Sequence, residues 1–137
     1  AAAIAAAEPE RIGRLGIVRQ RVRALQALAQ AVAEGGLALD ASAALEPTLR
    51  ALQALPGIGD WTAQLIAMRA LAWPDAWLPT DIGVLQALGT RLPAEATARV
   101  ESCRPWRAYA VMALWLGLEL PVSTGPQPPA PALDDAR

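Results

Sequence analysis

The stretch Leu55-Pro56-Gly57-Ile58-Gly59 lies between two segments whose apolar residues recur every three or four positions. This spacing places the apolar side chains on one face of a helix, so the stretch is predicted to be a turn between two helices. Glycine lets a ligand approach the backbone closely, and the amides at the start of a helix attract phosphate groups. The turn therefore indicates either an ordinary connection or a phosphate-binding hairpin built from backbone amides.

Helices are predicted on both sides of this turn. One begins at Pro47 and must end before Pro56, and the next begins near Asp60 and runs through Leu71 to a break at residues 73–74. Three further helices are predicted at residues 18–32, 93–102 and 105–118. Two more are predicted to begin at residues 8–10 and at residues 79–81, the latter with Thr80 or Asp81 as its cap. No stretch alternates as a β-strand does, and the predicted fold class is all-α.

The same spacing predicts which side chains are buried. In segment 18–32, one apolar face is expected to point inward, and the arginines of this segment are expected to face water. Three of the five tryptophans are expected to lie in the core, because tryptophan is more often a core residue than a pocket residue. The inward face consists of Val18, Val22, Leu25, Leu28 and Val32, the solvent-facing arginines are Arg19, Arg21 and Arg23, and the core tryptophans are Trp73, Trp77 and Trp106.

Length and composition indicate one globular unit. The chain has 137 residues, of which 54% are hydrophobic and 18% are charged, so a packed core is expected. Residues 121–137 are rich in proline and are predicted to form a disordered tail behind a helical domain at 1–120. We interpret Ala1 to Ala7 as the end of a helix cut by a boundary, so that part of the same domain is expected upstream.

Missing residue types exclude several chemistries. The sequence has no histidine and no lysine, so Ser-His-Asp catalysis and a lysine Schiff base are excluded. A single cysteine, Cys103, cannot form an internal disulfide, a Cys/His zinc site or an iron–sulfur cluster, which fits a cytoplasmic location.

The uncharged run 108–118 is too short for a membrane span, which needs about 20 residues. A net charge of −1 disfavours binding of nucleic acid by bulk electrostatics but leaves local arginine clusters possible.

Residues 55–63 resemble the helix-hairpin-helix signature of the base-excision DNA glycosylase superfamily. The resemblance implies a hairpin, Leu55, Pro56, Gly57, Ile58 and Gly59, whose amides bind a phosphate of the DNA backbone. It also implies that a monovalent cation assists, with the carbonyls of Leu55 and Ile58 as its candidate ligands. Asp60 departs from this pattern, because a neutral or basic residue would suit a site next to a phosphate better.

Residues 61–63, 78–81, 104–110 and 114–115 together resemble the 3-methyladenine DNA glycosylase II (AlkA) family, and the similarity covers most of residues 4–118. This chain resembles the C-terminal portion of the family, and the resemblance implies that Asp81 is the catalytic aspartate, which faces the glycosidic bond of the flipped-out base. On residue type alone, Asp81 would be a helix cap. The resemblance implies a base pocket formed by Trp61 and Trp115, with Leu65 in place of a tyrosine. Arg104 and Arg107 are candidate phosphate contacts, or they are solvated or paired with Glu101.

The implied activity is base-excision repair by a monofunctional hydrolase that cleaves the N-glycosidic bond of alkylated purines, such as 3-methyladenine and 7-methylguanine, in duplex DNA. Relatives that also cut the DNA backbone carry a lysine where this chain has Trp61, so no lysine-dependent lyase activity is expected. No cofactor is expected beyond the hairpin cation, and the chain is expected to act as a monomer without a membrane. Two alternatives are a non-catalytic helix-hairpin-helix DNA-binding module and an inactive fragment of a larger alkylation-repair protein.

Overall fold

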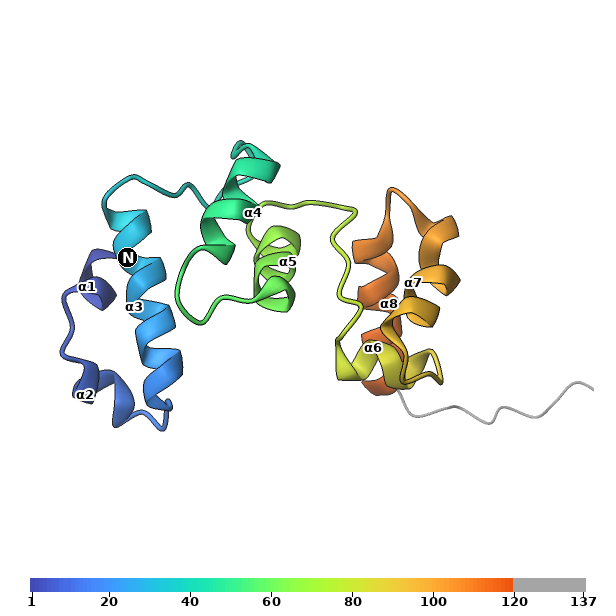
Figure 1. Ribbon diagram of the computed structural model, residues 1–137, viewed down its shortest axis with the longest axis horizontal. Helices are drawn as coiled ribbons and strands as arrows, with labels where there is room; N and C mark the ends of the chain where they lie inside the picture. Colours follow the sequence, from blue (N-terminus) through green and yellow to red (C-terminus); the bar gives the residue numbers. More distant parts are fainter. Residues whose placement is uncertain (120–137) are drawn as a thin grey trace, which may run out of the picture.

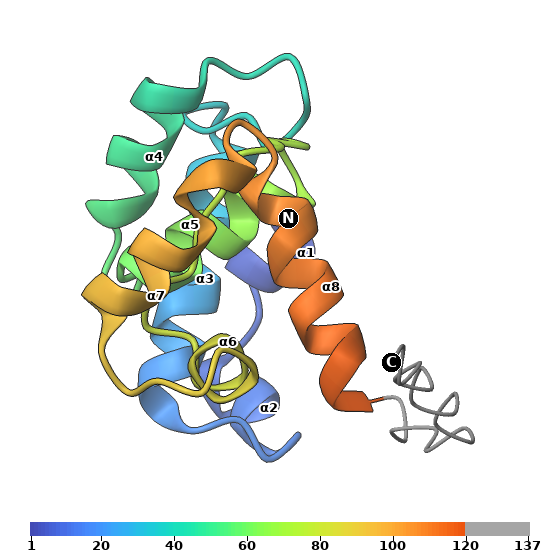
Figure 2. The same cartoon turned by 90° about the vertical axis from the view of Figure 1, so that its right-hand side faces the viewer.

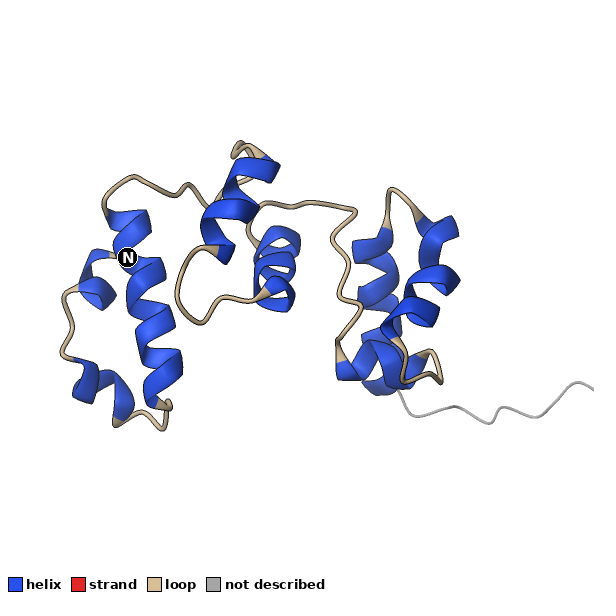
Figure 3. Cartoon of the chain, viewed as in Figure 1, coloured by secondary structure: helices blue, strands red, loops and turns tan. Residues whose placement is uncertain are grey.

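The computed structural model describes residues 1–119, and the predicted disordered tail lies outside them. Every regular element in this range is helical, so the predicted all-α class is confirmed (Figure 3). The elements are α1 (Ala2–Ala5), α2 (Pro9–Gly13), α3 (Arg19–Ala33), α4 (Leu45–Gln53), α5 (Asp60–Arg69), α6 (Ile82–Ala87), α7 (Pro93–Val100), a short 3₁₀ helix η1 (Glu101–Cys103) and α8 (Arg107–Glu119).

The helices form three groups along the long axis of the molecule, α1–α3, then α4 and α5, then α6–α8 (Figure 1). Two hydrophobic clusters hold the groups together. The first cluster contains buried residues of α4 and α5, such as Leu52 and Ala63, against which α3 packs. The second contains Trp77 and Leu78 together with buried residues of α6, α7 and α8. Helix α5 contributes to both clusters, because Leu65 and Met68 pack against the second.

Helix boundaries follow the predicted signals with small shifts. Pro9 and Pro93 stand in the first turn of α2 and α7, where a missing backbone N–H costs nothing. Helix α4 begins at Leu45, two residues before the predicted start. Helix α5 ends at Arg69 rather than at Leu71, because the chain turns at Ala72, whose φ is +52°. The turned view in Figure 2 shows α8 extending toward the end of the described chain.

Three of the predicted core positions are wrong. Val18 is 62% exposed because it is the extended N-cap of α3 and has not yet entered the helical face. Leu25 is 40% exposed, and Trp106 is 57% exposed and meets the ring of Tyr109 edge-on at the surface. The other members of the inward face are buried or partly buried, and the three arginines of α3 face water as predicted. Trp77 is buried in the core, whereas Trp73 is partly buried against the first cluster. None of the helices within residues 1–119 has the length and apolar character needed to cross a membrane.

Candidate functional site

The hairpin between α4 and α5 is a tight turn held by its own backbone and by one apolar side chain. The amide of Ile58 donates a hydrogen bond to the carbonyl oxygen of Leu55, with an N–O distance of 3.2 Å. The Ile58 side chain is buried in the first cluster, and Leu55 packs against that cluster. Pro56 is exposed at the tip of the turn. The hairpin is therefore fixed to the core on one side and open on the other.

The two hairpin glycines serve different purposes. Gly57 has a φ of +80°, which favours glycine, and a side-chain carbon there would lie only 3.1 Å from Cβ of Ala24 in α3. Gly59 has extended backbone, and a carbon added there would meet no protein atom within 4 Å. Gly57 is therefore required by the fold itself, whereas Gly59 keeps open the space in front of the helix.

The N-terminus of α5 has free backbone donors. Its N-cap is Gly59, which has no side chain to cap the first turn. The first amides of a helix lack partners within the helix and carry its positive dipole end. Asp60 places a negative charge in this turn, but its Oδ1 accepts a hydrogen bond of 3.1 Å from Nε2 of Gln53 in α4. The first turn of α5 therefore combines the positive end of the helix dipole with one carboxylate.

Asp81 is the N-cap of α6, and its carboxylate brings together the two tryptophans predicted for the site. Oδ1 accepts hydrogen bonds from the backbone N–H of Val84 and from the indole Nε1 of Trp115, both with N–O distances of 2.9 Å. Oδ2 accepts a bond of 3.0 Å from the indole Nε1 of Trp61. Three donors from three helices therefore fix both the position and the direction of this carboxylate.

These bonds also decide its charge. Burial opposes ionisation of Asp81, but the hydrogen bonds donated by Trp115, by the Val84 amide and by Trp61 outweigh it. The pKa of Asp81 is therefore lowered below the ordinary value of 3.8. Asp81 is therefore an anion at neutral pH.

The two tryptophans differ in their surroundings. Trp61 is 38% exposed and borders a groove of about 800 Å³ between α3 and the hairpin, whose other wall includes Leu25 and Leu28. Trp115 packs against the second cluster together with Leu65, and the guanidinium carbon of Arg69 lies 5.9 Å from the centre of its ring. The structure thus places Trp61 beside open space, and it places Leu65 and Trp115 against the second cluster.

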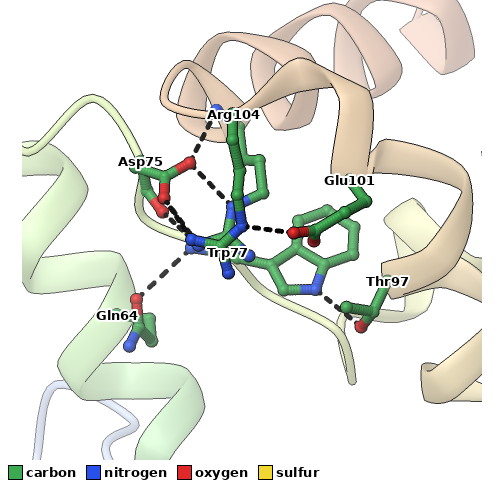
Figure 4. Close-up of polar contacts among 7 residues, drawn as sticks. Gln64, Asp75, Trp77, Thr97, Glu101 and Arg104 are labelled. Atoms are coloured by element: carbon green, nitrogen blue, oxygen red, sulfur yellow. Dashed lines mark hydrogen bonds and ion pairs between the residues drawn. The ribbon is translucent and has the colours of Figure 1, made fainter.

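A buried ion pair holds the loop that carries Asp81. Nε and an Nη of Arg107, the first residue of α8, contact the two carboxylate oxygens of Asp75 at 2.7 and 2.8 Å. The carboxylate also accepts a bond from Arg104, which in turn pairs with Glu101 (Figure 4). The Arg107 guanidinium holds the pKa of Asp75 below its ordinary value, although burial opposes this. The loop before Asp81 and the start of α8 are therefore fixed to each other.

The prediction of Arg107 as a phosphate contact needs correction. Its side chain is only 6% exposed, and its donors are directed at Asp75, so a phosphate outside the protein cannot reach it. Arg104 is half exposed and is paired with Glu101 at 2.8 Å, the alternative that the sequence had left open, and also with Asp75 at 3.0 Å. Both arginines belong to the structural network rather than to the open face of the hairpin.

The same loop is anchored at Trp77. Its backbone N–H donates to Oε1 of Gln64 in α5, and its indole N–H donates to the hydroxyl of Thr97 in α7 (Figure 4). These bonds connect the loop to helices on both of its sides. The carboxylate of Asp81, four residues further along, is therefore positioned by a segment with partners in α5, α7 and α8.

Comparison with known proteins gives a consistent result. No family model matches the chain. Over 118 residues it is 43% identical to a protein of Mycobacterium tuberculosis named "Probable bifunctional transcriptional activator/DNA repair enzyme AlkA". Over 112 residues it is 37% identical to the "DNA-3-methyladenine glycosylase 2" of Escherichia coli strain K12. The chain is a relative of the AlkA proteins.

The match to these AlkA proteins is extensive for this chain but partial for them. It covers 83% and 82% of the chain, and 24% and 40% of the respective relatives. The resemblance to the AlkA family seen in the sequence motifs is therefore confirmed. The chain spans between about a quarter and two fifths of the length of these relatives.

The AlkA motifs identified Asp81, Trp61 and Trp115, but other residues that shape the site did not stand out. Asp75 was missed because a single aspartate in a loop carries no signal until its partner Arg107 is seen in space. Gly83 was missed as well. A glycine inside a short helix, two positions after its cap, is an available signal, because glycine weakens a helix unless packing requires it.

Proposed function

We propose that this chain takes part in base-excision DNA repair by hydrolysing the N-glycosidic bond of alkylated purines, with 3-methyladenine and 7-methylguanine as substrates, in duplex DNA. One observation carries the proposal, namely an ionised carboxylate, Asp81, held by the indole N–H groups of two tryptophans. The names of the relatives, a DNA repair enzyme and a DNA-3-methyladenine glycosylase, support it.

The chemistry fits a site with a carboxylate and no histidine. An N3- or N7-alkylated purine carries a positive charge, so the bond between its nitrogen and the sugar C1′ breaks with both electrons going to the base, which leaves as a neutral molecule. The positive charge then develops on the sugar, where the fixed carboxylate of Asp81 stabilises it. Water supplies the new C1′–O bond, and its proton goes to Asp81 or to solvent. No general acid is needed.

Recognition of the base is assigned to the two tryptophans. A nucleotide must leave the helix to reach Asp81, and this is easiest for damaged or weakly paired bases. The face of a tryptophan attracts a cation by about 0.5 to 2 kcal/mol, with more at desolvated sites, which favours a charged alkylated base over a normal one. The groove bordered by Trp61 provides space beside one of the two side chains.

The hairpin is assigned to the DNA backbone. The open face at Gly59 and the amides of the first turn of α5 suit a phosphate of double-stranded DNA, bound by a single copy of the chain. A monovalent cation fits the carbonyls of Leu55 and Ile58, because the Leu55 oxygen accepts one hydrogen bond and retains a second lone pair. Such a cation would add positive charge near the phosphate.

The reaction is proposed to end with hydrolysis. The amine needed for a lysine Schiff base is absent from the sequence, and Trp61 stands where backbone-cleaving relatives carry that lysine. Borohydride treatment of the chain with DNA containing an abasic site is therefore expected to trap no covalent complex through a side chain. Detection of such a complex, mapped by mass spectrometry to a side chain, would contradict this part of the proposal.

A second candidate function is a DNA-binding module without catalysis. The observation in its favour is that Asp81 also caps α6 through the Val84 amide, a purely structural use of the carboxylate. In that case the hairpin would account for all of the function.

The experiment that separates the two candidates uses methylated duplex DNA and measures free 3-methyladenine and 7-methylguanine. The variant is Asp81→Asn, because asparagine caps a helix as well as aspartate does but carries no charge. The control is Asp40→Asn, which changes an exposed carboxylate in the loop after α3. Base release by the parent and the control, but not by Asp81→Asn, is expected. DNA binding without base release by the parent would favour the binding module.

A further inference from the structure

Gly83 lies in α6, two residues after Asp81, in direct contact with the pair formed by Asp81 and Trp115. A side-chain carbon at Gly83 would lie 3.2 Å from Oδ1 of Asp81, 3.2 Å from Cδ1 of Trp115 and 3.4 Å from its Nε1. Oδ1 and Nε1 are the two atoms of the 2.9 Å hydrogen bond between these residues. The space above Gly83 is therefore occupied by that hydrogen bond.

The backbone gives no other reason for a glycine at this position. Gly83 does not have a positive φ, and it lies inside α6. A glycine inside a helix costs about 0.5 to 1 kcal/mol relative to alanine. The cost is explained by the close approach of the Trp115 indole, which an alanine would obstruct.

The neighbouring side chains have little freedom to move away. The Asp81 carboxylate is also held by the Val84 amide and by Trp61. The Trp115 ring packs in the second cluster and faces the guanidinium of Arg69. A methyl group at position 83 would therefore require the indole or the carboxylate to move by a few tenths of an ångström, and this movement would fall on the hydrogen bond between them.

We propose that Gly83 is a positioning residue of this site, whose missing side chain lets the Trp115 indole reach Asp81 and fix its carboxylate. The importance of this position for base release rests on the proposed function. The contact of position 83 with Trp115 and Asp81 does not rest on the proposed function, because this contact can be measured without DNA. Gly83 sets where Trp115 lies and, through its indole N–H, how strongly Asp81 is held as an anion.

The test compares Gly83→Ala with Gly117→Ala in the full chain. Gly117 is a matched control because it also lies inside a helix, α8, and a carbon added there meets no atom within 4 Å. NMR of the protein without DNA follows the indole N–H resonance of Trp115 and the carboxyl carbon of Asp81 through a pH titration. Gly83→Ala is expected to shift the Trp115 resonance and raise the pKa of Asp81, and Gly117→Ala to change neither.

A double variant shows whether the effect passes through the hydrogen bond. Trp115→Phe removes the indole N–H, so Gly83→Ala added to it is expected to raise the pKa of Asp81 no further. If Gly83→Ala alone does not fold, adding Trp115→Leu is expected to restore folding, because leucine lacks the planar ring that meets the new methyl group. An unchanged Trp115 resonance and Asp81 titration in a folded Gly83→Ala protein would overturn the proposal. So would failure of Trp115→Leu to restore folding of Gly83→Ala, if Trp115→Leu by itself folds.

Base release provides a separate readout. If the chain is a glycosylase, Gly83→Ala is expected to lower the rate by about 10- to 100-fold, as loss of a hydrogen bond to a charged group does, while Gly117→Ala keeps the parent rate. If the parent releases no base, the proposed function fails. The NMR titration still decides whether Gly83 positions Trp115, so the two failures are distinguishable.

Discussion

The indole nitrogen of Trp115 lies 2.9 Å from Oδ1 of Asp81, although the two residues are 34 positions apart in the chain. Their contact depends on the placement of α8 against α6. The ion pair between Asp75 and Arg107 fixes the start of α8 to the loop before Asp81, and the second cluster packs the helices together below it. The hydrogen bond between Trp115 and Asp81 thus depends on the ion pair between Asp75 and Arg107, which holds α8 in place.

Replacing Trp61 tests the weaker of the two indole bonds. Trp61→Phe removes the donor to Oδ2 but keeps an aromatic ring beside the groove. The pKa of Asp81 is expected to rise, and base release to fall by about two- to tenfold, because Trp61 is partly exposed and water can replace its bond. The carboxyl carbon titration and the methylated-DNA assay measure these effects. A larger loss than for Trp115→Phe would contradict this ranking.

Stability is expected to depend on pH through Asp75 and Asp81. Each carboxyl has a lower pKa in the folded protein than in the unfolded chain, where it is about 3.9. The stability that each ionised carboxylate contributes is therefore complete above about pH 3.9. It is lost as the pH falls through the pKa of the folded state. The free energy of unfolding from urea denaturation should therefore change little between pH 7 and pH 5 and fall below about pH 4. Asp81→Asn should remove part of that fall. A main decline above pH 5 would show that other groups dominate.

The two arginines next to Asp75 are expected to differ strongly in their effect on stability. Arg107→Met leaves a buried carboxylate without its main partner, and breaking a buried pair in this way costs about 3–5 kcal/mol. Arg104→Met removes a half-exposed partner and should cost about 0–1 kcal/mol. Urea denaturation of both variants measures the difference. Similar small losses in both would mean that the Asp75 pair contributes little to the fold.

The hairpin glycines are expected to separate stability from DNA binding. Gly57→Ala forces a side chain into a left-handed conformation and against Ala24, so it should destabilise the fold by about 1–2 kcal/mol. Gly59→Ala should leave stability nearly unchanged, because it meets no protein atom, but should weaken binding to duplex DNA by about the worth of one charge-assisted hydrogen bond, 1.5–3 kcal/mol. Fluorescence anisotropy at fixed low salt measures the second effect. Unchanged DNA affinity in Gly59→Ala would argue against phosphate binding at this hairpin.

Local signals predicted most of the fold, and motifs predicted the centre of the site. Proline and glycine marked the helix ends, and helical spacing marked the face of α3 except at Val18 and Leu25. The sequence could not reveal that Arg107 turns inward to Asp75, because an ion pair between residues 32 positions apart depends on how α8 packs. Trp106 was misplaced for a related reason, since residue type alone does not show which face of a loop is covered.

The carboxylate of Asp81 connects two helices, α5 and α8, that come from different groups of the fold. One of its indole partners comes from α5, whose Ala63 and Ala67 belong to the first cluster, and the other comes from α8, which packs in the second. Any sliding of α5 against α8 would lengthen one of these two hydrogen bonds. The indole N–H resonances of Trp61 and Trp115 would therefore report a displacement of α5 relative to α8.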